Sequence, residues 1–233
     1  MDNNNTHIEG LVVDCNIGKT PLGQPYADLI VCAVKSINGD KESSFFQVRV
    51  PVSDKIKDNI DAIASDCIKN KKLIDRTGTQ LANHAIACNG RIRNDVTGQP
   101  YILAKPEDMS FPLEIFEKNN MIKAEGEVFR TVNTSPIAAS LLIKIDNGPD
   151  KPATVLPVII DAKTHPEVWS SAANGEISKG DRLKFSGNPH GKIFGHGKDI
   201  MLRMSVKADS ASVVMKQNLK TATRKKPASK KSL

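Results

Sequence analysis

The sequence predicts a mainly β protein made of two consecutive small barrels of five strands, each with a short helix between its third and fourth strands. Three observations lead to this fold class. Short apolar runs alternate with Gly, Pro and Asn turns, the elements follow the same order in both halves, and the chain of 233 residues has room for two such domains. An apolar content of 39% supplies a core for each half.

The first half contains three strand-like runs, a helical segment and two further strand-like runs. Residues 45–52 alternate, with Phe46 and Val48 on one face and Phe45 and Arg49 on the other. After them, isoleucines recur at helical spacing. The expected elements are strands at residues 11–15, 27–34 and 45–52, a helix at 53–73, and strands at 85–93 and 101–104.

The second half repeats this plan. The expected elements are strands at residues 122–130, 140–145 and 154–161, a helix at 165–173, and strands at 181–187 and 200–206 joined by a Gly-rich loop at 188–197. Two pairs of glycines correspond between the halves: Gly10 with Gly126, and Gly90 with Gly187. Glycine at these places suits the sharp bends that a small barrel needs in order to close.

Three strands, a helix and two strands is the element order of the OB fold, a small barrel that binds oligonucleotides and oligosaccharides. The sequence therefore predicts an N-terminal OB barrel at residues 1–112, a linker at 113–118 and a C-terminal OB barrel at 119–214. A disordered basic tail is expected at 215–233. Residues 216–233 hold seven Lys or Arg and no acid, which equals the whole net charge of +7, so the body of the chain is neutral.

The first half resembles the bacterial single-stranded-DNA-binding protein family. Residues 16–34 (NIGKTPLGQPYADLIVCAV) look like the family's opening hairpin, and residues 177–191 (ISKGDRLKFSGNPHG) resemble its K-K-G-x-x-V-x-V-x-G run. The resemblance implies an OB fold and single-stranded DNA as ligand. The chain departs from the family in carrying two barrels, in ending with basic residues where the family has an acidic tip, and in lacking stacking tryptophans in the first barrel. A tandem version of this kind fits a phage or mobile-element homologue.

Binding single strands without sequence preference needs aromatic faces for the bases and cations for the phosphates. Such side chains fall on outward-facing strand positions, beside the two Gly-Gln-Pro turns, in the 188–197 loop (interpreted as a clamp over the strand) and in the tail. The candidate nucleic-acid-binding residues are Tyr26, Phe45, Arg49, Arg91, Arg93, Tyr101, Phe129, Arg130, Lys184, Lys192, Phe194, Lys198, Lys225 and Lys226. A structural role at the barrel rim, or an ordinary exposed hairpin, remains the alternative for each.

The sequence lacks the common catalytic motifs, and its four cysteines are not spaced as zinc ligands, so we expect no enzymatic activity, no metal and no cofactor. We expect non-catalytic binding of single-stranded DNA in replication, recombination or repair. The alternatives are an RNA-binding protein and a protein–protein adaptor in a replication complex. Other expected partners are replication or recombination proteins and a second copy of the chain, with no membrane. The expected location is the cytoplasm, including a nucleoid or host cytoplasm, with the nucleus as an alternative because of the tail.

Overall fold

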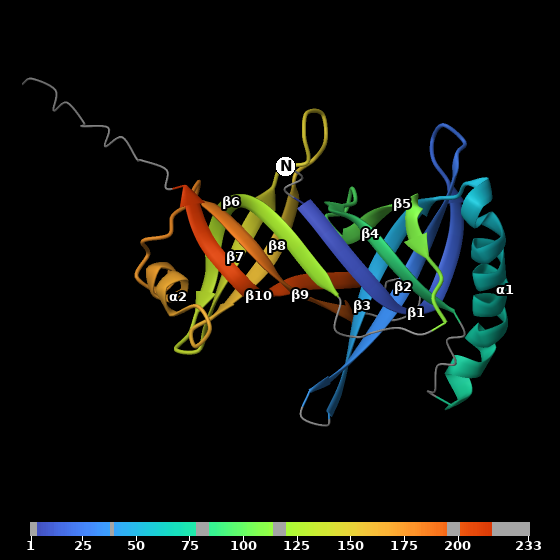
Figure 1. Cartoon of the computed structure of the whole chain (residues 1–233), viewed down its shortest axis with the longest axis horizontal. Helices are drawn as coiled ribbons and strands as arrows, with labels where there is room; N and C mark the ends of the chain where they lie inside the picture. Colours follow the sequence, from blue (N-terminus) through green and yellow to red (C-terminus); the bar gives the residue numbers. More distant parts are fainter. Residues whose placement is uncertain (1–3, 38–39, 78–83, 114–119, 195–200, 216–233) are drawn as a thin grey trace, which may run out of the picture.

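The fold is mainly β, as the sequence predicts, and is known from a computed structural model that describes residues 4–37, 40–77, 84–113, 120–194 and 201–215. The described part contains ten strands, all joined in one sheet, and two helices. The two halves of the chain lie side by side along the longest axis, with helix α1 at one end and helix α2 at the other (Figure 1).

In the first half, strand pairing closes a ring in the order β1-β2-β3-β5-β4 and back to β1. The bounds are β1 Asn4–Lys19, β2 Pro25–Ile37, β3 Asp40–Pro51, α1 Asp54–Thr77, β4 Ala85–Asn94 and β5 Pro100–Ser110. The apolar alternation predicted for β3 is confirmed, because Phe46, Val48 and Val50 are fully buried. Three isoleucines of α1 (Ile56, Ile60 and Ile63) are buried in the same core.

The second half closes a ring in the corresponding order β6-β7-β8-β10-β9 and back to β6. The bounds are β6 Met121–Thr134, β7 Ala138–Ile145, β8 Thr154–Asp161, α2 Pro166–Ala173, β9 Arg182–Phe194 and β10 Met201–Met215. Trp169 of α2 packs against the core and donates its indole N–H to the Ser135 carbonyl oxygen at 2.9 Å.

The predicted glycine correspondence has the same register in both rings. Gly10 pairs with Ile86 and Gly126 with Leu183, and four residues further along the partner strands lie Gly90 and Gly187. A Cβ at Gly10 or at Gly126 would come within 2.6 Å of a carbonyl oxygen on the neighbouring strand. Both sites therefore need glycine for the same close approach.

The two rings meet where the start of β1 pairs with β6, between Asn4↔Ala124 and His7↔Met121. Asn4 is 7% exposed and bonds both backbone groups of Ile92, at 2.9 and 3.0 Å. From the second ring, the Thr154 hydroxyl donates to the same Ile92 carbonyl at 3.2 Å, and the Asn4 amide donates to Asn147 at 3.3 Å. A buried polar network thus fixes the junction.

One predicted element is wrong. Residues 188–194, interpreted from their glycines and proline as the start of a mobile clamp loop, belong to strand β9. They pair in continuous register with β10, from Asn188↔Lys207 to Phe194↔Met201. The glycines did not signal a loop, because Gly187 and Gly191 lie where other backbone segments approach too closely for a Cβ. Residues 195–197 of the predicted loop lie outside the described residues.

Within the described residues, neither helix has the length and apolar character to cross a membrane. The thiols behave as the sequence indicates for buried cysteines. Cys88 is 1% exposed, and burial raises its pKa to about 12. Burial also raises the pKa of Cys15 to about 12, with the neighbouring Cys67 adding to the effect.

Candidate nucleic-acid interface

A row of four side chains crosses the outer face of the first ring. The strand register aligns Asp28 of β2 with Arg49 of β3, Arg49 with Leu103 of β5, and Leu103 with Arg91 of β4. The flanking residues Leu29, Val48 and Ile102 are fully buried, so the row occupies the opposite, solvent-facing side of the same strands.

Two copies of the tetrapeptide Gly-Gln-Pro-Tyr place a tyrosine on each side of this row. Gly23 and Gly98 have positive φ angles (79° and 84°) and close matching turns just before β2 and β5. Because β3 lies between β2 and β5, the turns bring Tyr26 and Tyr101 to opposite sides of Arg49. The Arg49 guanidinium carbon lies 4.8 Å from the centre of each ring. We call these three residues the stacking cluster.

Asp28 holds the Arg49 guanidinium in this position. Both carboxylate oxygens of Asp28 accept hydrogen bonds from Arg49, from Nε and from Nη2, each at 2.7 Å. This hydrogen bonding raises the pKa of Arg49 above its ordinary value, so the guanidinium stays charged. A cavity of 250 Å³ lies over the cluster and is also lined by Lys19 and Leu103. The cluster thus offers aromatic faces and a fixed cation at an open surface.

A second, larger cavity begins on the other side of Leu103. It measures 620 Å³ and its charged lining consists of Arg91, Arg93, Lys105, Lys151 and a single acid, Asp108. The remaining lining residues are Asn4, Asn5, Asn89, Gly90 and Leu103. We call this the basic cavity. Leu103 belongs to both cavities, so the basic cavity continues directly from the stacking cluster.

Arg93 is the most buried cation of the basic cavity. It is 8% exposed, and its Nη1 has no hydrogen-bond partner. Burial, and then the charge of Arg91 nearby, lower its pKa below the ordinary arginine value. The side chain of Arg93 therefore stays desolvated beside a like charge, and an anion in the cavity would relieve both costs.

The second ring does not repeat the stacking cluster. Its matching row runs Ser140–Ile159–Lys207–Asn188, in the register that aligns Asp28, Arg49, Leu103 and Arg91 in the first ring. The positions of Tyr26 and Tyr101 are taken there by Ala138 and Ser205. At this part of its surface, the second ring has neither an aromatic ring nor an arginine.

The remaining predicted residues lie apart from the stacking cluster. Phe45 sits four residues along β3 from Arg49, and its backbone contacts Gly191 of β9. Phe129 and Phe194 are each 42% exposed, the first under Lys179 at 5.3 Å and the second under Arg203 at 5.1 Å. Arg130, Lys184 and Lys192 are exposed on β6 and β9. Lys198, Lys225 and Lys226 lie outside the described residues.

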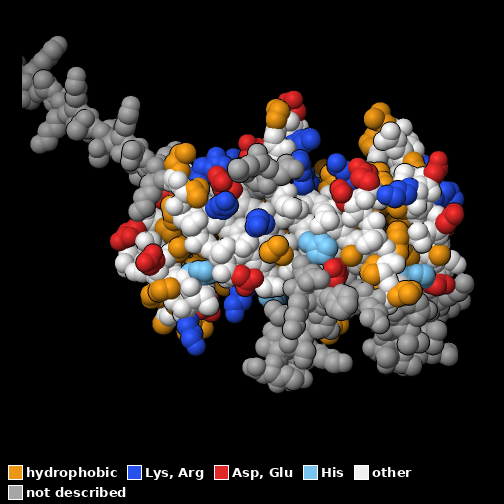
Figure 2. Space-filling view, viewed as in Figure 1, with side chains coloured by type: hydrophobic (Ala, Val, Ile, Leu, Met, Phe, Trp, Pro, Cys, Tyr) orange, Lys and Arg blue, Asp and Glu red, His pale blue; other side chains and the backbone are white. Residues whose placement is uncertain are grey.

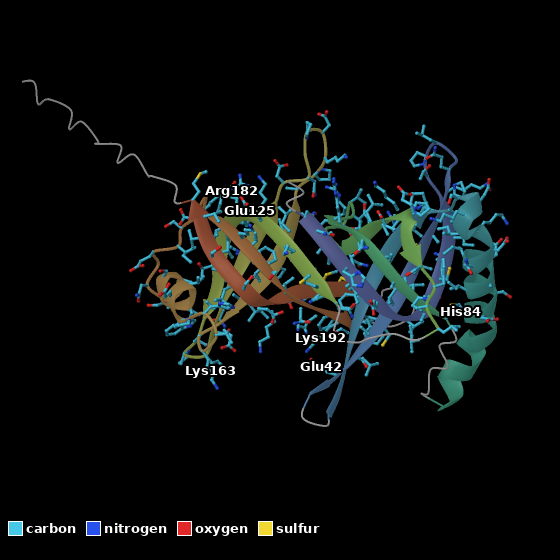
Figure 3. The ribbon with its side chains drawn as sticks, in the orientation of Figure 1. Glu42, His84, Glu125, Lys163, Arg182 and Lys192 are labelled. Carbon is cyan, nitrogen blue, oxygen red and sulfur yellow. The ribbon has the colours of Figure 1, made fainter. Side chains whose placement is uncertain are left out.

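The surface around these groups mixes both signs of charge. Figure 2 shows Lys and Arg side chains along the upper part of both halves, with Asp and Glu side chains between them. In Figure 3, Arg182 lies beside Glu125, to which it is ion-paired at 2.8 Å, and Lys192 lies near Glu42, where β9 meets the β2–β3 hairpin. Net attraction for an anion is therefore local to the basic cavity.

Sequence reasoning missed three residues of the basic cavity. Lys105 continues the outward alternation of Tyr101 and Leu103 along β5, so a period-2 pattern could have found it. Asn4 and Lys151 come from the start of β1 and from the β7–β8 connection. Only the tertiary contact between the rings brings them to the cavity, and no sequence pattern signals it.

Among the described residues, no group of three or more His, Cys, Asp or Glu side chains could hold a metal ion. No protein-family model matches the sequence. No curated protein matches it either.

Solved structures do resemble the chain. Wild-type single-stranded DNA binding protein from Thermus aquaticus aligns with a TM-score of 0.59 at 15% identity, over 92% of this chain and 94% of that one. A deletion mutant of the same protein aligns with a TM-score of 0.57 at 14% identity, over 92% of this chain and 95% of that one. At this identity the likeness shows the fold, and it extends over both halves.

Proposed function

We propose that this protein binds single-stranded DNA without a sequence preference and without catalysing a reaction. The observation that carries the proposal is the stacking cluster, in which two tyrosine rings flank an arginine on an open barrel face. Bases of any sequence stack on aromatic faces, and each stacked base contributes about 1–3 kcal/mol. The basic cavity beside the cluster supplies the cations that a phosphate backbone needs. The fold shared with the Thermus aquaticus protein supports the same ligand class.

The proposal includes the arrangement of the chain. We propose that each ring is an OB barrel, at residues 1–112 and 119–214, with a linker at 113–118 and a basic tail at 215–233 that adds sequence-independent affinity. Because the cluster residues have no counterparts in the second ring, stacking belongs to the first barrel. A protein of this kind would serve replication, recombination or repair, in the cytoplasm or nucleoid of a cell or in a phage-infected host.

The experiment compares tyrosine variants by fluorescence anisotropy with labelled oligo-dT. Tyr26→Ala and Tyr101→Ala are each predicted to weaken binding about tenfold, the equivalent of one stacked base at about 1.4 kcal/mol. Tyr26→Phe and Tyr101→Phe keep the ring and should bind like the wild type. Phe194→Ala, which removes an exposed aromatic side chain of the second ring, is the matched control and should change affinity less than twofold.

The same titrations separate the other two functions. An RNA-binding protein would prefer oligo-rU over oligo-dT, since nothing else in the assay differs but the sugar and the base methyl group. A protein–protein adaptor would bind neither strand above the level of a duplex of equal length. Equal binding by Tyr26→Ala, Tyr101→Ala and the wild type would refute the stacking cluster as the base site.

A further inference from the structure

The basic cavity is built by both rings. Arg91 and Arg93 lie on β4 and Lys105 lies on β5, whereas Lys151 belongs to the β7–β8 connection of the second ring. Figure 1 shows this connection as a yellow loop rising beside the N-terminal start of β1. The network of Asn4, Ile92 and Thr154 lies next to the cavity and fixes the two rings there. The cations are therefore held in place before any ligand arrives.

Four cations against one acid leave the cavity with an uncompensated positive charge. Part of that charge is exposed to water: the side chain of Lys105 is 72% exposed and forms only a 3.7 Å pair with Glu107. Arg93 is different, because it is desolvated and one of its guanidinium nitrogens has no partner. A buried guanidinium with a free donor is suited to a phosphate oxygen, which accepts charge-assisted hydrogen bonds.

We propose that the basic cavity is a phosphate-binding site that takes a backbone phosphate of the strand held by the stacking cluster, so that Lys151 ties the bound strand to the second ring. This inference rests on the proposed function. The path is continuous, because Leu103 lines both the stacking-cluster cavity and the basic cavity. The second ring thus contributes to binding without a stacking site of its own.

A neighbouring cavity of 540 Å³ in the second ring is less suited to an anion. It shares Lys151 with the basic cavity and adds Lys144 and Arg182, but it also contains Glu127 and Asp146. In addition, Arg182 is already ion-paired with Glu125. Its charges nearly balance, which is why the phosphate site is assigned to the basic cavity.

The test uses the full chain and the variants Lys151→Ala and Arg93→Met. Lys163→Ala is the control, because Lys163 is an exposed lysine of the second ring and lies at the opposite, lower edge in Figure 3. Each protein is titrated with oligo-dT of about 8 and about 30 nucleotides across a salt series, lengths that bracket the site of one barrel. A separate arm measures Tm in inorganic phosphate against chloride at equal ionic strength.

The slope of log K against log salt should fall by about 0.7 in Lys151→Ala with the longer strand, because one phosphate contact is lost. That slope corresponds to about fivefold weaker binding at 0.1 M salt. Arg93→Met should lose at least as much with both strands, and Lys163→Ala should bind like the wild type. Inorganic phosphate should raise the Tm of the wild type more than that of Arg93→Met.

Two outcomes overturn the inference in distinguishable ways. If the wild type binds oligo-dT, the Tyr26 and Tyr101 variants weaken it, and Lys151→Ala matches Lys163→Ala, then the strand does not pass through the cavity, although the proposed function stands. If the wild type fails to bind oligo-dT but phosphate still raises its Tm, the cavity serves a free phosphate anion, and both the strand assignment and the proposed function are wrong.

Discussion

Replacing Arg93 with methionine is predicted to make the protein more stable while weakening its binding of single-stranded DNA. Arg93 is 8% exposed, and its Nη1 has no hydrogen-bond partner. An unsatisfied buried donor costs about 1–3 kcal/mol, and methionine fills the space of the arginine stem without a polar group. We therefore expect the free energy of unfolding to rise by about 1–3 kcal/mol. In a chain of this length each kcal/mol raises Tm by about 2–4 °C.

Thermal and urea denaturation followed by circular dichroism, without nucleic acid and at low phosphate, would measure the change. Lys105→Met is the control, because it removes a cation from the same cavity whose side chain is 72% exposed. Its free energy of unfolding should stay within about 0.5 kcal/mol of the wild type. If Arg93→Met is less stable than the wild type, the guanidinium is satisfied in the free protein, and the argument that it awaits an anion fails.

Three further predictions concern the junction, the thiols and the tail. Asn4→Ala removes the bonds to Ile92 and should lower the free energy of unfolding by about 1–3 kcal/mol in urea melts; an unchanged midpoint would show that the network does not fix the rings. Because their pKa values are raised to about 12, Cys15 and Cys88 should resist alkylation at pH 8 in the folded protein and react in urea, as mass spectrometry would reveal, whereas rapid labelling of the folded chain would contradict their burial. A chain ending at Met215 should keep its preference for single strands but show a shallower salt dependence, by about 0.7 per lost phosphate contact, and an unaltered slope would mean that the tail makes none.

The core and the direction of the outward-facing residues could be predicted from the sequence, because they follow from local alternation. Phe46 and Val48 point into the core, and Arg49 points out, as the period of two requires. The glycine correspondence between the halves also held, since a close backbone approach leaves few other residues acceptable at Gly10 and Gly126. These features depend on near neighbours along the chain or on single-residue sterics.

Strand lengths and the clamp loop could not be predicted in the same way. The start of β1 at Asn4 is polar, and it is a strand because β6 lies alongside it. Residues 188–194 carry glycine and proline, yet β10 supplies them with a continuous pairing partner. In both places a distant strand outweighs local propensity.

The candidate site divides along the same line. Tyr26, Arg49 and Tyr101 could each be chosen from the sequence, but their assembly into one cluster depends on β3 lying between β2 and β5. Lys151 could not be chosen at all, because it reaches the basic cavity from the other half of the chain. Sequence patterns identify side chains suited to a ligand, whereas the topology decides which of them share it.

The most direct test of the central claim is an anisotropy titration of the chain ending at Met215 with oligo-dT, its RNA counterpart and a duplex. The wild type, Tyr26→Ala and Tyr101→Ala would be compared at one salt concentration. The account predicts a clear preference for oligo-dT in the wild type and a loss of about tenfold in each variant. Equal affinity for the duplex, or no effect of either tyrosine substitution, would contradict it.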